Sequence, residues 1–266
     1  MLSAVITLDA DPELQVGPLT LAWHGIGIAA GIGVGWLIAG RYAKRRELDR
    51  ERLLNVVLVM ILSGMVGARA FYLLLNDPAA LVRSGDWLGT RGFAFYGAMI
   101  LGTLSVGIYL RRARLGLRYL DALAAGFPLG MAVGRIGDVI NGEHHGPPSD
   151  APWAIRYLHP DADVPSSAVA YHPGGLYEIV VALVIAPIVW WLSRRLSRPG
   201  MLLWAVIGLY AAGRFLIFFY RSDSEPLALG LEEAQWTSIG LIAAAGTAAW
   251  LASRGGGSAG KAASAC

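Results

Sequence analysis

Hydrophobic and polar positions alternate along this chain on the scale of whole helices. Stretches of roughly 20 mostly apolar residues, each long enough to cross a bilayer core of about 30 Å, are separated by short polar loops. They run near residues 19–40, 54–75, 92–110, 119–141, 174–192, 200–220 and 235–252. The pattern predicts an all-α polytopic membrane protein with about seven transmembrane helices.

Basic residues gather in alternate loops of this pattern. The loops "RYAKRRELDRER", "RRARLGLRY" and "LSRRLSRPG" follow the first, third and fifth stretches. Because cytoplasmic loops carry the excess of Lys and Arg, we expect the N-terminus outside and the C-terminus in the cytoplasm. Residues 1–252 are predicted to form a single transmembrane domain, with a small extracytoplasmic segment at about 142–173. The Gly-, Ala- and Ser-rich tail 253–266 is predicted to be disordered.

Composition supports the membrane class and narrows the function. Of the 266 residues, 55% are hydrophobic and only 15% are charged, with a net charge of +3. A soluble domain usually has about a quarter charged residues, and a nucleic-acid-binding protein carries a larger basic excess. The single cysteine, Cys266, excludes an intrachain disulfide and a cysteine-based metal site.

Several polar residues lie inside the predicted spans, where a charge costs at least ~2.5 kcal/mol. The orientation inferred above puts six of them near the outer ends of six different spans, namely His24, Arg69, Tyr96, Arg135, Glu178 and Arg214. Asp138 lies one turn after Arg135. We therefore expect these helices to converge on one layer in the outer leaflet.

Arginines outnumber carboxylates in this set, so we expect a pocket for an anionic lipid headgroup, which a planar guanidinium binds well. The structural alternative is internal pairing. Arg135 and Asp138 are spaced i, i+3 on one helix face, and Glu178 could pair with Arg69 or Arg214. Too few carboxylates are expected for all the arginines to be paired in this way.

Five segments, in order, resemble the bacterial prolipoprotein diacylglyceryl transferase family. "GRIGDVINGEHHG" is similar to its signature G-R-x-[GA]-N-F-x-N-x-E-x-x-G, and "GARAFYLLLND" to its G-x-R-x-x-Y segment. "HPGGLYE" resembles its H-P-S-Q-L-Y-E, "GLYAAGRFLIFFYR" its G-R-F-x-x-E-F-x-R, and "LGLEEAQW" its L-G-L-x-x-G-Q. The seven-helix topology with an external N-terminus is also the family's.

The resemblance implies a multi-pass enzyme of the bacterial inner membrane. Such enzymes move a diacylglyceryl group from phosphatidylglycerol to the lipobox cysteine of a secreted prolipoprotein, release glycerol phosphate and require no metal or cofactor. The implied catalytic residues are His24, Tyr96, Arg135, Glu143 and Arg214. The implied substrate-binding residues are Arg69, Tyr72, Asp138, Asn141, Gly146, Tyr177, Glu178 and Arg221.

Four departures from the family pattern bear on the expected chemistry. Asp138 stands where the signature has asparagine, and Phe218 replaces a glutamate. His24 and Tyr96 stand where the family has tyrosine and histidine, so a His–Tyr pair with its members exchanged is predicted if the two side chains face each other. His24 is the candidate general base, because imidazole titrates near neutral pH; its alternative role is a structural bond to a neighbouring helix.

Other roles remain open from the sequence. Glu143 is expected to orient Arg135 or Arg214 or to bind glycerol hydroxyls. The run "EHH" at 143–145 predicts no metal site, since three adjacent residues cannot face one ion from a helix. Arg221 could bind lipid headgroups at the interface. The alternatives to the transferase are a diverged protein that binds anionic lipid without transfer, and a transferase with another lipid donor or acceptor.

Overall fold

The computed structural model describes residues 5–87, 92–221 and 226–254. The chain divides into two compact units, and each is described by itself. Unit 1 comprises Met1–Tyr42 and Leu120–Cys266, and unit 2 comprises Ala43–Tyr119. The predicted disordered tail lies almost wholly at 255–266, outside the described residues.

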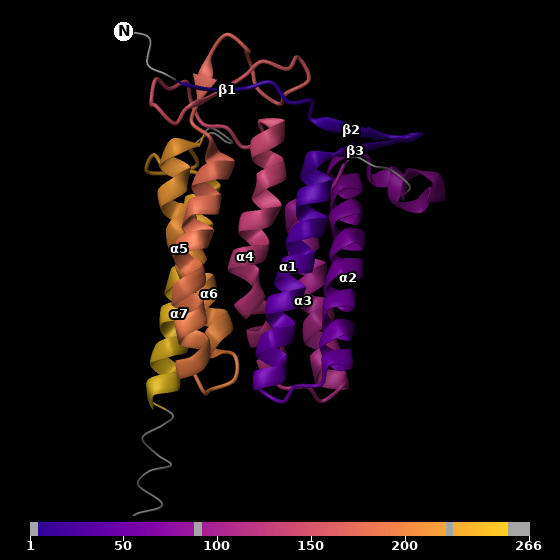
Figure 1. Ribbon diagram of the computed structural model, residues 1–266. Helices are drawn as coiled ribbons and strands as arrows, with labels where there is room; N and C mark the ends of the chain where they lie inside the picture. The colour runs from indigo at the N-terminus through magenta and orange to yellow at the C-terminus, as the bar shows by residue number, and fades with distance from the viewer. Residues whose placement is uncertain (1–4, 88–91, 222–225, 255–266) are drawn as a thin grey trace, which may run out of the picture. The chain divides into compact units, whose positions relative to one another are not determined.

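Unit 1 is built mainly from long helices (Figure 1). These are α1 (Trp23–Arg45, as far as Tyr42), α4 (Arg118–Asn141, from Leu120), α5 (Gly174–Arg195), α6 (Met201–Ile217) and α7 (Glu233–Arg254). A short 3-10 helix, η3 (Phe218–Tyr220), extends α6. Helix α6 packs against both α5 and α7.

Helices α1 and α4 approach each other through glycines. A methyl group at Gly27, Gly31 or Gly126 would collide with the carbonyl oxygen of Gly134, Gly130 or Gly35, respectively, on the other helix. At Gly137 it would meet the backbone of Trp23 and His24. Small residues let transmembrane helices pack at backbone distance. The start of α1 is therefore held directly against the last two turns of α4.

A buried carboxylate fixes the start of α6 against α4. Asp121, which is 2% exposed, accepts hydrogen bonds from the backbone N–H groups of Gly200 at 2.8 Å and Leu203 at 2.9 Å. Helix N-termini leave such N–H groups unpaired, and an acceptor there stabilises the helix. Gly200 has a φ of +85°, a conformation that glycine adopts at little cost.

Short strands accompany the helices of unit 1 and were not predicted from the sequence. Strands β1 (Ile6–Leu8), β4 (Ile155–Tyr157) and β5 (Ala170–Tyr171) form a sheet in the order β1-β4-β5, with β1 parallel to β4 and β4 antiparallel to β5. Strands β2 (Glu13–Val16) and β3 (Leu19–Ala22) form a hairpin that leads directly into α1. The three-stranded sheet includes two strands of the predicted extracytoplasmic segment.

Unit 2 is a helical hairpin of α2 (Arg50–Asn76) and α3 (Phe95–Arg112), with the 3-10 helices η1 (Pro78–Val82) and η2 (Ser84–Trp87) in the connection. Gly67 and Gly97 face each other where α2 and α3 pack. The side chain of Asp49 accepts hydrogen bonds from the first N–H groups of α2. This cap begins the helix four residues before the apolar stretch predicted at 54–75.

The expected membrane class is confirmed. Within the described residues, six helices are long and apolar enough to cross a membrane: α1, α2, α4, α5, α6 with η3, and α7. Helix α3 coincides with the remaining predicted stretch at 92–110. The protein is a mostly helical, multi-pass membrane protein.

Candidate active site

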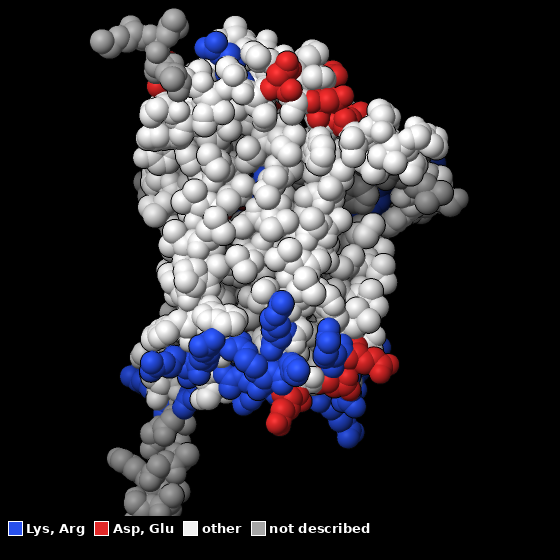
Figure 2. Space-filling model, viewed as in Figure 1, with Lys and Arg blue, Asp and Glu red and all other residues white. Residues whose placement is uncertain are grey.

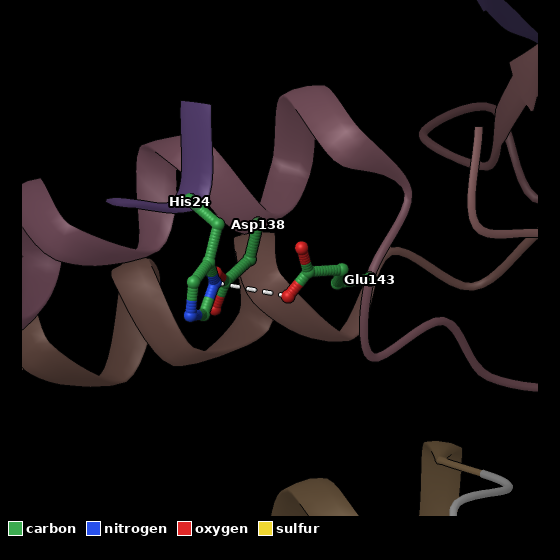
Figure 3. Close-up of side chains that lie close together, drawn as sticks. All are labelled: His24, Asp138 and Glu143. Atoms are coloured by element: carbon green, nitrogen blue, oxygen red, sulfur yellow. Dashed lines mark hydrogen bonds and ion pairs between the residues drawn. The ribbon is translucent and has the colours of Figure 1, made fainter. Parts of the chain in front are cut away.

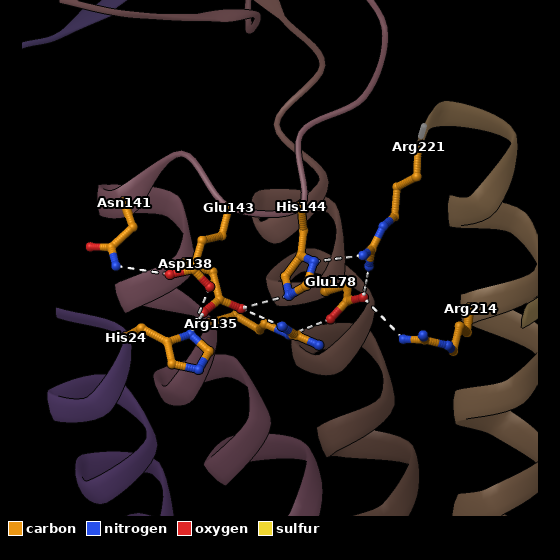
Figure 4. A network of polar contacts seen from close by, with 9 residues as sticks. All are labelled: His24, Arg135, Asp138, Asn141, Glu143, His144, Glu178, Arg214 and Arg221. Carbon is orange, nitrogen blue, oxygen red and sulfur yellow. Dashed lines mark hydrogen bonds and ion pairs between the residues drawn. The ribbon is translucent and has the colours of Figure 1, made fainter. Parts of the chain in front are cut away.

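Nine polar residues of unit 1 form one network of contacts (Figure 4). They come from α1, α4, α5, α6 and the segments that follow α4 and η3. The members are His24, Arg135, Asp138, Asn141, Glu143, His144, Glu178, Arg214 and Arg221. Eight of them were candidate site residues from the sequence, and the ninth, His144, was not.

Glu178 is the centre of the network. It lies in the second turn of α5 and is 1% exposed. Its Oε1 accepts a hydrogen bond from Arg221 Nη1 at 2.6 Å and lies 3.4 Å from Arg214 Nη1, while its Oε2 forms an ion pair with Arg135. One buried carboxylate thus holds three guanidinium groups, and their positive charges compensate the cost of its burial.

Asp138 links this centre to α1. One of its oxygens, Oδ2, forms an ion pair with Arg135, and the other, Oδ1, lies 2.6 Å from Nδ1 of His24. The carboxylate is buried, with a side chain only 2% exposed. His144 Nε2 lies 3.9 Å from Oδ2. Asp138 therefore stands between an arginine and a histidine and contacts each with a different oxygen.

His24 is held by two carboxylates through the same ring nitrogen (Figure 3). Its Nδ1 lies 2.6 Å from Asp138 and 2.9 Å from Oε2 of Glu143. A carboxylate accepts, so these contacts favour a proton on Nδ1; the neutral imidazole then has its lone pair on Nε2. The side chain is 38% exposed. This arrangement suits a general base that takes a proton at Nε2.

Glu143 follows α4 and is oriented from two sides. Its Oε1 accepts a hydrogen bond from Asn141 Nδ2 at 2.9 Å, and its other oxygen contacts His24. Burial by itself raises the pKa of Glu143, but hydrogen bonds from His24 and Asn141 to the charged carboxylate outweigh it and hold that pKa below its usual value. Gly142, with a φ of +81°, turns the chain out of α4 so that Glu143 faces back toward His24.

Phe218 stands where the resemblance implies a glutamate, and its ring lies between two arginines. The guanidinium carbons of Arg214 and Arg221 lie 4.7 Å and 4.6 Å from its ring centroid. These distances are typical of cation–π contacts. The aromatic ring thus supports two guanidinium groups that also contact Glu178, although it supplies no acceptor oxygen.

Aromatic side chains adjoin the network. The hydroxyl of Tyr177 accepts a hydrogen bond from Trp153 Nε1 at 2.8 Å and lies 2.6 Å from His172 Nδ1. The rings of Tyr177 and His172 also pack against that of Tyr220. At Gly146 a side chain would collide with the Tyr220 carbonyl, which accounts for glycine there.

Three candidate residues belong to unit 2. Arg69 donates a hydrogen bond to the carbonyl oxygen of Gly92 at 3.0 Å, and its guanidinium lies over the rings of Tyr72 and Phe93. Tyr96 lies in the first turn of α3 and is 44% exposed. The predicted exchange between His24 and Tyr96 stays a prediction, as does the convergence of six spans on one layer.

The pairings offered as the structural alternative are present. Arg135 pairs with Asp138, and Arg214 contacts Glu178. The expectation of too few carboxylates concerned three arginines, of which Arg69 belongs to unit 2, and for the set as a whole it stays a prediction. The sequence did not reveal that one buried carboxylate, Glu178, contacts both Arg135 and Arg214.

Arg221 is buried, with 6% exposure, which corrects its placement among lipid headgroups at the interface. It contacts Glu178 and, through Nη2, lies 2.8 Å from His144 Nδ1. The role of His144 was missed. Its sequence signal was its place in "EHH", and that run of residues does not indicate a bond to an arginine.

One group of these side chains has the donor set of a metal site. His24, Asp138 and Glu143 each offer a ligand atom, and these atoms lie within 4.8 Å of one another. One imidazole and two carboxylates can bind a transition metal. However, the imidazole–carboxylate distances are those of hydrogen bonds, and Arg135 already neutralises Asp138. Hydrogen bonding therefore accounts for the cluster by itself.

Comparisons with known proteins identify the family of this chain. A family model described as prolipoprotein diacylglyceryl transferase matches residues 13–251. The phosphatidylglycerol--prolipoprotein diacylglyceryl transferase of Methylococcus capsulatus is 36% identical over 251 residues, covering 87% of this chain and 89% of the relative. Proteins of the same name from Clostridium botulinum and Thermosynechococcus vestitus are each 32% identical, covering 79% and 86% of this chain and 86% and 88% of their own lengths. The chain belongs to the prolipoprotein diacylglyceryl transferase family.

Proposed function

We propose that this protein transfers a diacylglyceryl group from phosphatidylglycerol to the lipobox cysteine of secreted prolipoproteins, in the bacterial inner membrane. Family membership supports the reaction class. Within the molecule, the observation that carries the proposal is the juxtaposition of a carboxylate-held imidazole, His24, with the arginines around the buried Glu178. Lys and Arg gather in alternate loops, and this pattern supports a location of both the N-terminus and the site on the outer side of the membrane.

The arginines are proposed to act on the lipid donor. Arg135 and Arg214 would bind the phosphate of phosphatidylglycerol, while Glu178 keeps their guanidinium groups in place. A guanidinium has several N–H donors, so contact with a carboxylate leaves donors for a phosphate oxygen. Preorganised cations at the phosphate would stabilise the negative charge that develops as the C–O bond breaks.

His24 is proposed to activate the acceptor. Its Nε2 would take the proton of the cysteine thiol, and Asp138 and Glu143 would stabilise the resulting imidazolium. The thiolate sulfur would attack the glycerol carbon that bears the phosphate. A C–S bond forms, the C–O bond to phosphate breaks, and glycerol phosphate leaves with the bonding electrons. These steps require no metal or cofactor.

The remaining candidates are proposed to contact substrate or to shape the site. Arg221, Asn141 and Gly146 would position the network, and Tyr177 would contact a substrate beside it. Arg69 and Tyr72 are proposed to bind lipid from unit 2. Tyr96 is proposed as the partner of His24; single changes at both positions and the exchanged pair would test this, and indifference to all three would refute it.

The direct test uses purified protein in detergent with phosphatidylglycerol and a lipobox peptide. Mass spectrometry should detect a diacylglyceryl increment on the peptide. The increment should be absent with Arg135→Ala and with a peptide in which the cysteine is replaced by alanine. No increment with the unaltered protein, together with Arg135-dependent stabilisation by the lipid, would instead support binding without transfer.

A further inference from the structure

Asp138 is shared between the two halves of the proposed mechanism. Its Oδ1 accepts from His24 Nδ1 at 2.6 Å, on the side that would activate the acceptor. Its Oδ2 pairs with Arg135, on the side that would bind the donor phosphate. The carboxylate is buried, so these contacts operate with little screening by water. A change in the contact between Oδ2 and Arg135 must therefore alter the strength of the hydrogen bond between Oδ1 and His24.

Glu143 provides an internal comparison. It also contacts His24 Nδ1, at 2.9 Å, but its other oxygen accepts from Asn141, a neutral amide. Its side chain is 24% exposed, whereas that of Asp138 is 2% exposed. Two carboxylates thus hold the same nitrogen, and in the described contacts Asp138 is the one that pairs directly with an arginine of the proposed phosphate site.

A phosphate at Arg135 would compete with Asp138 for the guanidinium. Arg135 is also paired with Glu178, which would keep the guanidinium in place as its contact with Asp138 weakens. Relieved of part of this ion pair, Asp138 becomes a stronger acceptor for the Nδ1–H of His24. A stronger bond at Nδ1 makes Nε2 a better acceptor, because hydrogen bonds in a chain polarise one another.

We propose that Asp138 couples the two substrates, so that donor phosphate at Arg135 strengthens the hold of Asp138 on His24 and thereby readies His24 for the acceptor. This inference rests on the proposed function. The groups that face His24 and Asp138 from the neighbouring segments are Glu143, Arg135 and His144. Asp138 is a positioning residue here, since it acts through His24 and Arg135.

Coupling is reciprocal, so the acceptor must tighten the donor by the same factor. The experiment measures the affinity for phosphatidylglycerol in nanodiscs of otherwise zwitterionic lipid, with and without a lipobox peptide in which Ser replaces Cys. The serine hydroxyl can donate to Nε2 but is a poor nucleophile, so the complex persists. We expect the peptide to tighten lipid binding roughly 5-fold or more in the unaltered protein, at the lower end of typical coupling.

Three variants separate coupling from simple support of the imidazole. Asp138→Asn should abolish the tightening, leaving affinities with and without peptide within about 2-fold of each other. Glu143→Gln removes a carboxylate from the same nitrogen and should retain most of it. Arg135→Lys keeps the charge but loses the planar fork, and should also abolish it. This last variant serves as the test if Asp138→Asn does not fold.

The outcomes distinguish failure of this inference from failure of the proposed function. Equal tightening in the unaltered protein and Asp138→Asn, with transfer intact, would overturn the coupling alone. So would the absence of tightening in a protein that transfers the diacylglyceryl group. A protein that shows no transfer to a cysteine peptide would overturn the proposed function itself.

Discussion

Arginine serves two different purposes at the two ends of the unit 1 helices. Near the starts of α1 and α5, Arg135, Arg214 and Arg221 surround the buried Glu178. At the other ends of α5 and α7, exposed arginines lie over tryptophan rings one turn earlier, with Arg194 over Trp190, Arg195 over Trp191 and Arg254 over Trp250. Figure 2 shows Lys and Arg gathered where α5 and α7 end.

The two environments differ in how much hydration free energy an arginine side chain loses. An exposed arginine beside a tryptophan keeps its hydration and suits the boundary between membrane and water. A buried arginine loses its hydration and is stable only with a compensating partner. Proteins retain such expensive charges inside membranes mainly where function requires them. The buried end is therefore where substitution should affect both stability and catalysis.

The largest effect on this comparison is expected from Glu178→Gln. The change would leave three guanidinium groups around a neutral amide, and breaking a buried ion pair costs about 3–5 kcal/mol. The free energy of unfolding, measured by denaturant titration in detergent, should fall by that amount. Arg194→Gln is the control at the exposed end, and a similar loss in both variants would contradict the distinction.

The second largest effect is expected on catalytic activity, which should fall after substitution at the buried end but not at the exposed end. Arg214→Gln is expected to lower kcat/KM for diacylglyceryl transfer by about 10²–10³-fold, since one preorganised donor to a developing charge contributes that much. Arg254→Gln, at the exposed end of α7, should change kcat/KM by less than about 2-fold, because its contact with Trp250 is remote from the chemistry. Equal losses in the peptide assay would refute the assigned role of Arg214.

Low pH should lower the stability of the protein by protonating Glu143 at the buried end of the helices. Its folded-state pKa is held below the usual 4.5, after burial is outweighed by hydrogen bonds from His24 and Asn141. Its contribution is therefore fully present above pH 4.5 and is lost as the pH falls toward the folded-state pKa. The thermal midpoint of the unaltered protein should drop across this window. Glu143→Gln should show a smaller drop, and an unchanged pH profile would argue against the bond to His24.

The smallest effect is expected from the Trp–Arg pairs. Replacing Trp250 by Leu removes the ring beneath Arg254 while keeping an apolar side chain. An exposed cation–π contact contributes about 0.5–1 kcal/mol, so the unfolding free energy should fall by no more than that. If the unfolding free energy fell as much as in Glu178→Gln, the exposed pairs would contribute as much to stability as the buried ion pairs, and the comparison would fail.

The helices were predictable because each must bury an apolar stretch of bilayer length. The predicted stretch at 174–192 is α5, and that at 119–141 is α4. The strands were missed because β1 and β4 are three residues each and pair across about 150 positions of sequence, a separation that local patterns do not encode. Their pairing depends on the tertiary fold.

Site residues were predictable where burial in a membrane makes a charge costly. Arg135, Asp138, Glu178 and Arg214 all stood out for this reason, and all belong to the network. The sequence did not predict which of these side chains would contact one another. The two carboxylates that share Nδ1 of His24 come from α4 and the segment beyond it, and only the approach of α1 brings the imidazole to them.

The glycine contacts between α1 and α4 have a consequence for how this enzyme could diverge. Because backbone meets backbone at Gly27, Gly134 and Gly137, the distance between the two helices does not depend on the side chains at positions 24 and 138. New functional groups can enter those positions without any need to repack the interface. A lineage can thus alter its acid–base chemistry in small substitutions while the supporting scaffold remains unchanged.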